Sequence, residues 1–159
     1  MNDPAAKEPS YFEVLHDRFS KELPNGARAE LRRCVLVEDT RYTPALYRLL
    51  LSDRQITEAQ TRLAYMLPFC PIKDGKAHPG AVLVAAGVSE ERVMQIARTH
   101  RTNPSDALTG LRRVVQHAEG KMPWVKLARL VSRWRTEDVR ELVEGYFLNL
   151  HKLDKGAQS

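Results

Sequence analysis

The chain has 159 residues, of which 43% are hydrophobic and 28% are charged, and its formal net charge is +5 at pH 7. These values are typical of a globular protein with one sizeable core, and they exclude collagen-like, disulfide-rich and intrinsically disordered classes. No apolar run approaches the roughly 20 residues of a membrane helix, and the N-terminus lacks a signal-peptide layout. We therefore expect a cytoplasmic protein without a membrane partner. The basic pI near 9.4 favours a polyanionic binding partner.

The chain begins with an expected tail and two helices. Residues 1–9 contain two prolines and no periodic apolar pattern, which predicts a flexible tail. A helix is expected over residues 11–22, where apolar residues recur at helical spacing before a Pro-Asn-Gly turn. Asn25 of that turn can cap a second helix, which carries Arg32 and Arg33 outside its narrow apolar stripe. Taken alone, these arginines fit a solvated helix face.

The middle of the chain predicts more helices and one long loop. Thr43-Pro44 is a helix start signal, and a later apolar stripe closes at Pro68. Arg54 lies between these two segments. Residues 71–80 have the Gly and Pro density of a loop and could form a mobile connection. Ser89 then opens a helix that ends in the basic segment ARTHRT.

No segment alternates with period two over a useful length, so the chain is predicted to be all-α. We expect a compact helical bundle in a single domain over residues 10–155, with residues 156–159 as a second tail. Within it, an N-terminal helical half (about 10–70) would pack against a C-terminal half (about 81–153). No internal repeat or low-complexity tract suggests another organisation.

Positive charge is concentrated between Arg98 and Arg135. This stretch has nine lysines and arginines but only two acids, Asp106 and Glu119, so its local charge exceeds that of the whole chain. It includes Arg101, which shares the end of one helix with Arg98. The rest of the chain is therefore slightly acidic, and the basic stretch is the candidate functional region.

Two further helices are predicted within this stretch. The first starts after Asn103-Pro104 and directs Arg113 away from its apolar arc, with Arg112 at the boundary. The second starts at Pro123 and ends near Trp134. Its apolar face contains both tryptophans of the chain, which we expect in the core rather than as base-stacking platforms. Its opposite face carries three cations at i, i+3 and i+7: Lys126, Arg129 and Arg133.

Neither helix interleaves acids with these cations, whereas the helix expected after Thr136 has a mainly acidic outer face. We therefore expect the two basic helices to contact a nucleic-acid backbone, with a solvated or inter-subunit face as the alternative. A helix-turn-helix DNA-binding motif is a further alternative for these two helices. Against it, the second helix presents lysine and arginine suited to phosphates, and lacks the Asn and Gln that commonly read adenine.

Catalytic and metal-binding patterns are not evident. The acids and the five histidines are dispersed, and no phosphate-binding or nucleophile motif occurs. Cys34 and Cys70 have no ligand-like spacing and are expected to be buried thiols. The sequence therefore predicts no enzyme activity, no metal, no cofactor and no small-molecule substrate.

Five ordered blocks carry a family resemblance: ELRRC, TPALYRLL, QIARTHRT, LRRVVQHAE and PWVKLARLVSRW. Over roughly residues 25–150 the chain resembles the CasB-type small subunit of the type I-E CRISPR Cascade complex. The resemblance implies a non-catalytic, all-helical subunit, present as two copies among other Cascade subunits in antiviral defence. It also implies contacts near the guide RNA–target heteroduplex and with the displaced DNA strand, made through phosphates because the guide reads the sequence.

The basic surface of that family would map here onto nine arginines, and the helix pattern adds one lysine. The candidate nucleic-acid-binding residues are Arg32, Arg33, Arg54, Arg98, Arg101, Arg112, Arg113, Lys126, Arg129 and Arg133. A protein-interaction subunit whose basic face docks an acidic neighbour is the alternative from another functional class.

Overall fold

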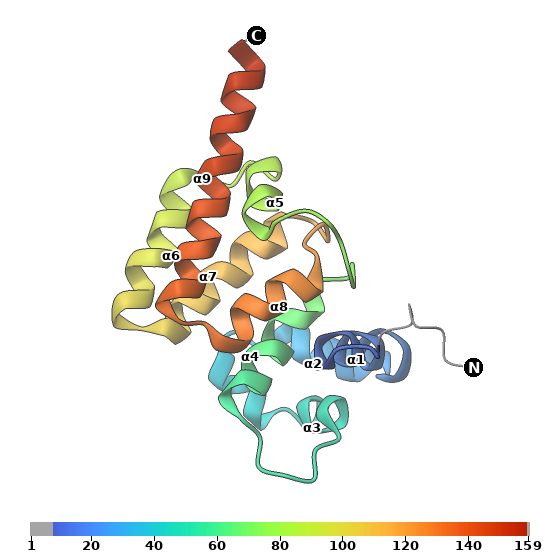
Figure 1. Ribbon diagram of the computed structural model, residues 1–159. Coiled ribbons are helices and arrows are strands. Elements are labelled where there is room, and N and C mark those ends of the chain that lie inside the picture. Colours follow the sequence, from blue (N-terminus) through green and yellow to red (C-terminus); the bar gives the residue numbers. More distant parts are fainter. Residues whose placement is uncertain (1–7, 159) are drawn as a thin grey trace, which may run out of the picture.

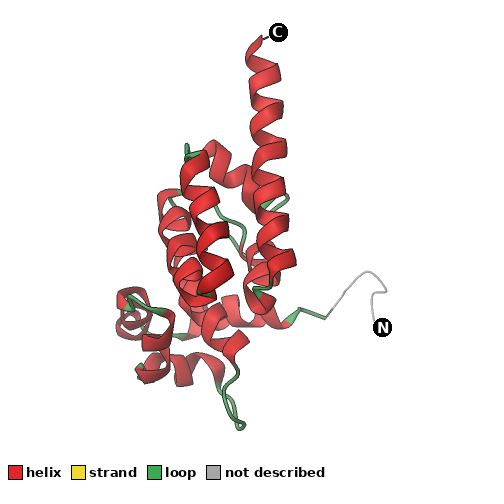
Figure 2. Ribbon diagram, turned by 90° about the vertical axis from the view of Figure 1, so that its left-hand side faces the viewer, coloured by secondary structure: helices red, strands yellow, loops and turns green. Residues whose placement is uncertain are grey.

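The computed structural model describes residues 8–158, and those residues form an all-helical molecule (Figures 1 and 2). Its N-terminal part contains α1 (Tyr11–Asp17), η1 (Arg18–Glu22), α2 (Asn25–Arg33), η2 (Val37–Tyr42), α3 (Pro44–Leu50), α4 (Glu58–Met66) and η3 (Leu67–Phe69). Its C-terminal part contains α5 (Pro79–Ala85), α6 (Glu90–Thr102), α7 (Pro104–His117), α8 (Trp124–Arg133) and α9 (Thr136–Gln158). No strand occurs in this part of the chain, so the all-α prediction is confirmed.

The helix ends follow local capping chemistry. Ser89 Oγ accepts the amide of Arg92 at 3.3 Å, and Asn103 Oδ1 accepts the amide of Asp106 at 3.1 Å. The expected cap of α2 is corrected, because Asn25 is itself the first helical residue and makes no cap hydrogen bond. Its side chain instead accepts a hydrogen bond from Arg28.

One continuous core joins the two parts of the chain. The tryptophan prediction is confirmed, since Trp124 and Trp134 are 0% and 4% exposed. Their indole Nε1 atoms donate to the carbonyls of Phe12 and Pro104, at 2.7 and 2.9 Å. Such polar partners allow a large indole to be buried without an unpaired donor. Both cysteines are free and buried, as expected.

The segment between η3 and α5, predicted as a loop, contains no helix but is held against α8. The carbonyl of Ile72 accepts the amide of Trp124 at 2.8 Å, and that of Lys73 accepts the amide of Val125 at 3.1 Å. Lys73 Nζ also pairs with Asp17 at 3.3 Å. The segment therefore supplies acceptors for amides at the start of α8, which no intrahelical carbonyl can satisfy.

The helices pack as a bundle in which α9 lies against α5, α6 and α8, while α6 also lies along α7 (Figure 1). In both views the C-terminal end of α9 rises beyond the other helices. Residues 156–158, expected as a tail, continue this helix. Of the expected N-terminal tail, residues 1–7 lie outside the part that the structure describes.

Candidate nucleic-acid interface

Four of the predicted arginines line one cavity between α2 and α7, and three of them have exposed side chains. Arg32 and Arg33, in the last turn of α2, and Arg113, in α7, line a cavity of about 220 Å³ with Gln116. All three arginines are exposed. No acid within residues 8–158 lies at ion-pair distance from them. Their positive charges therefore add at this cavity, although α2 and α7 are distant in sequence.

Arg112 lines the same cavity but, unlike the other three arginines, it is buried. Its side chain is 4% exposed, and its guanidinium group donates to backbone carbonyls of the protein. Nη2 donates to the carbonyls of Leu31 and Arg32, at 3.2 and 2.8 Å, and Nη1 donates to that of Cys34. These carbonyls belong to the C-terminal end of α2, where a cation also meets the negative end of the helix dipole.

Aromatic rings complete the environment of this guanidinium. Arg112 Cζ lies 4.1 Å from the centroid of the Tyr65 ring and 4.6 Å from that of the Phe69 ring. Cation–π contact offsets part of the cost of burying this charge, which has no carboxylate at ion-pair distance among residues 8–158. Arg112 is therefore a structural residue that holds the end of α2, and with it Arg32 and Arg33.

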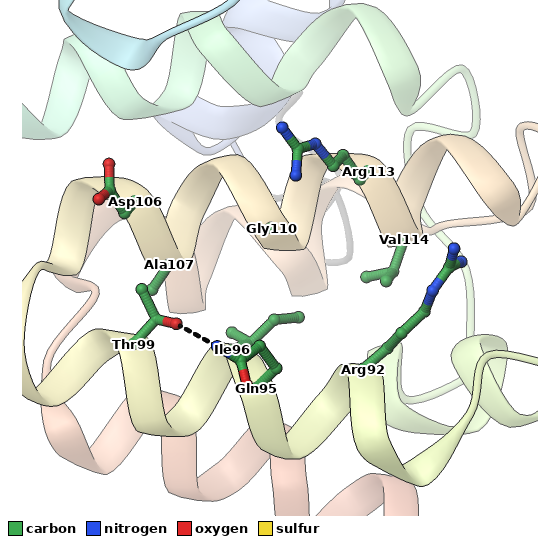
Figure 3. Close-up of a pocket in the computed structure, with 9 residues that line it drawn as sticks. All are labelled: Arg92, Gln95, Ile96, Thr99, Asp106, Ala107, Gly110, Arg113 and Val114. Atoms are coloured by element: carbon green, nitrogen blue, oxygen red, sulfur yellow. Dashed lines mark hydrogen bonds between the residues drawn. The ribbon is translucent and has the colours of Figure 1, made fainter.

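Two further cavities extend this basic surface. Arg32 also lines a cavity of about 350 Å³ with Arg28, and Arg113 also lines the groove between α6 and α7 with Arg92 (Figure 3). Together five residues form what we call the arginine path: Arg28, Arg32, Arg33, Arg113 and Arg92.

The candidate list from the sequence omitted Arg28 and Arg92. A signal for each was present: Arg28 precedes Arg32 by one helical turn, and Arg92 shares a stripe with Gln95 and Thr99 at i, i+3 and i+7.

A histidine at the edge of the path adds no charge. His16 lines the same cavity as Arg28, and its Nε2 lies 3.1 Å from the carbonyl oxygens of both Cys70 and Pro71. Burial lowers the pKa of His16, and this effect outweighs the two carbonyl contacts that raise it. The imidazole is therefore neutral at pH 7 and donates through Nε2, so the arginines alone supply the positive charge there.

The cations of α8 form a separate edge, which does not line the cavities of the arginine path. Arg129 is exposed, whereas Lys126 is half-buried and donates to the carbonyl of Lys76. The prediction that this edge is bare of acids is corrected for Arg133, which pairs with the buried carboxylate of Asp138 at 2.8 Å. The two basic helices thus do not form one continuous row of cations.

The remaining candidates also lie outside the arginine path. Arg98 is exposed and pairs with Glu91 at 3.2 Å, and Arg101 is exposed in the last turn of α6. Arg54 lies between α3 and α4, where it lines a cavity with Arg41. No group of three or more potential metal ligands is found in residues 8–158. No helix in that range is long and apolar enough to cross a membrane.

Fold and surface together define an all-helical protein with a positively charged path across α2, α7 and α6. The sequence matches the family described as CRISPR-associated protein Cse2 over residues 27–147, and the chain belongs to this family. The resemblance inferred from the sequence blocks is thereby confirmed.

Two relatives illustrate the similarity. The CRISPR system Cascade subunit CasB of Escherichia coli strain K12 is 27% identical over 150 residues, which cover 85% of this chain and 92% of the relative. A chain in the crystal structure of E. coli Cascade bound to a PAM-containing dsDNA target has a TM-score of 0.77 and 25% identity. That match covers 91% of this chain and 99% of the other.

Proposed function

We propose that the chain is a non-catalytic subunit of a type I-E CRISPR Cascade complex and that it binds nucleic acid through backbone phosphates. The observation that carries the proposal is the arginine path, where arginines from three helices line neighbouring cavities and no acid in residues 8–158 lies at ion-pair distance from them. The relatives support the assembly, since one is named a Cascade subunit and the other was solved in Cascade bound to dsDNA. The proposed partners are other Cascade subunits, a second copy of this chain, the guide RNA and the target or displaced DNA.

The chemistry of the path suits phosphate rather than base edges. Guanidinium groups bind phosphate oxygens through parallel N–H donors, and their charge persists at every physiological pH. Such contacts carry no sequence information, which fits a complex in which the guide RNA reads the target. We therefore propose that this subunit stabilises the opened DNA irrespective of its sequence.

The double variant Arg33→Ala, Arg113→Ala tests this proposal. Both side chains are exposed, so their removal leaves the core intact. We expect weaker binding of every single-stranded DNA sequence, and a salt slope smaller by about 1.4, at about 0.7 per lost phosphate contact. Fluorescence anisotropy with mixed-sequence DNA over a salt series measures both quantities.

A matched control removes two exposed arginines elsewhere, through Arg48→Ala in α3 and Arg140→Ala in α9. It lowers the net charge equally but leaves the arginine path complete, so affinity should change much less. Equal losses in the two double variants would show that net charge, and not the path, determines binding.

The separate edge of α8 favours one alternative, a surface that docks an acidic neighbouring protein. Under this alternative the isolated chain would not bind DNA or RNA even at low salt, and Arg129→Glu would abolish assembly. A helix-turn-helix function would instead appear as preference for particular oligonucleotides in competition with random DNA. The same anisotropy assay therefore separates the three functions.

A further inference from the structure

We propose that the groove between α6 and α7 receives one unpaired nucleotide, whose base lies on the apolar floor of the groove while its flanking phosphates contact Arg113 and Arg92. This inference rests on the proposed function, because it assigns a particular role to one end of the arginine path. The groove has a volume of about 210 Å³ and is lined by residues of both helices. Figure 3 shows these residues along the two facing helices.

The floor of the groove is apolar. Ile96 from α6 faces Ala107, Gly110 and Val114 from α7. Gly110 matters most, because a Cβ atom at this position would lie 3.4 Å from Ile96 Cγ1, on the floor itself. Glycine within a helix costs about 1 kcal/mol relative to alanine. Its place in the middle of α7 therefore lowers helix stability but keeps the groove open to a flat apolar group.

The rims of the groove are polar and differ in charge along its length. Arg113 rises from the α7 rim beside the cavity shared with α2, and Arg92 reaches from α6 beside Val114 (Figure 3). Neither arginine has an acid at ion-pair distance within the described chain. Asp106 lies toward the other end, where its carboxylate accepts a hydrogen bond from Asn103 Nδ2 at 3.0 Å.

This distribution fits a nucleotide better than a wholly apolar ligand. Phosphates are attracted to the arginine end and repelled by Asp106, while a base can donate its N–H groups to Asp106 or to Gln95. Gln95 Nε2 is engaged by Thr99 Oγ1 at 3.3 Å, which leaves Gln95 Oε1 as an acceptor over the groove. A single-stranded nucleic acid whose phosphates contact Arg32, Arg33 and Arg113 in turn would thus place a base in the groove. Its next phosphate would then contact Arg92.

The test compares two single-stranded DNAs of equal length and charge, one of mixed sequence and one in which abasic sugars replace the central nucleotides. Both DNAs offer the same phosphates to the arginines. A difference between their affinities therefore reports a pocket that binds a base. We expect the wild-type chain to bind the mixed-sequence DNA about fivefold more tightly, from burial of one base on apolar surface. Fluorescence anisotropy at fixed salt measures both affinities.

Gly110→Leu should remove this preference, because its side chain fills the groove, while affinity for the abasic DNA stays unchanged. Gly110→Ala adds one methyl group and is compatible with the helix, so it supplies the test if the leucine variant does not fold. We expect it to reduce the preference in part. Arg92→Gln is the complementary variant, and it should weaken binding of both DNAs alike.

Two results would overturn the inference, and they are distinguishable. Equal wild-type affinity for the two DNAs would exclude the nucleotide pocket while leaving the phosphate-binding function intact. No binding of either DNA at low salt would exclude the proposed function and the pocket together. A base preference that survives in Gly110→Leu would also overturn the inference, because it would place the base elsewhere on the surface.

Discussion

Arg112 and Arg113 are consecutive residues of α7 with opposite environments. A helix turns by about 100° per residue, which is enough to place one guanidinium in the core and the next on the surface. Arg113 is exposed on the arginine path, whereas Arg112 donates to the carbonyls that end α2. A variant that removes both arginines would therefore mix a loss of charge with a loss of stability.

We predict that Arg112→Met lowers the free energy of unfolding by about 3 kcal/mol, because the carbonyls at the end of α2 lose their donors and stay buried. Arg113→Met is the matched control, and its effect should stay within about 0.5 kcal/mol because the side chain is exposed. Urea denaturation followed by circular dichroism measures both changes. A small and equal effect of the two substitutions would contradict the structural role of Arg112.

At the scale of elements, the crossing of α5 and α9 depends on two glycines. A Cβ atom at Gly80 would lie 2.3 Å from the backbone nitrogen of Tyr146, and one at Gly145 would lie 2.1 Å from His78 Cε1. His78 Nδ1 accepts the amide of Gly80 at 2.9 Å, so the same imidazole caps α5 and covers Gly145. The two helices can approach this closely only because neither glycine has a side chain.

We predict that Gly80→Ala destabilises the protein by about 3 kcal/mol, since backbone atoms of α9 must move. This loss of stability is opposite in sign to the gain of about 1 kcal/mol that replacing glycine by alanine usually brings to a helix. A thermal melt should show a midpoint lower by roughly 9 °C for a chain of this size.

Gly26→Ala is the control, because nothing lies within 4 Å of a Cβ atom at that position of α2. Its midpoint should stay the same or rise slightly. A lower midpoint in both variants would mean that close packing against α9 is not the cause.

The ends of these helices were predictable because their signals are local. Ser89 and Asn103 cap α6 and α7 as the sequence indicates, and Gly87 follows α5 with a φ of +76°. The depth at which Arg112 is buried was not predictable, because its acceptors lie about 80 residues earlier. Asp138 belongs to the helix that the sequence predicts to have a mainly acidic outer face, yet it is buried as the partner of Arg133.

At the scale of the whole molecule, gathering the arginines of the path requires the tertiary fold. Periodicity shows which side of each helix is polar, but it does not show which polar sides meet. The sequence places the largest excess of charge in α7 and α8, whereas the cavities join α7 with α2 and α6. The basic stretch therefore contains only one residue of the arginine path, Arg113, and the other four lie outside it.

The two expected halves are joined by hydrogen bonds between side chain and backbone. Arg62 of α4 donates through Nε to the carbonyl of Val131 at 2.8 Å and through Nη2 to that of Ser132 at 2.5 Å. Arg112 connects α7 to α2, and the core is continuous between the halves. Separation of the halves would leave these polar groups unpaired and expose apolar surface on both sides.

We therefore predict that the chain unfolds in one cooperative transition. Both tryptophans lie in the C-terminal half, and Trp124 also donates to the carbonyl of Phe12 in the N-terminal half. Their fluorescence therefore reports the C-terminal half and its contact with α1, whereas far-ultraviolet circular dichroism reports all helices. The two signals should give the same urea midpoint and the same slope. Arg62→Met should lower both midpoints together, because it breaks contacts between the halves. Two separate midpoints, or a shift of only one signal in Arg62→Met, would show that the halves fold independently.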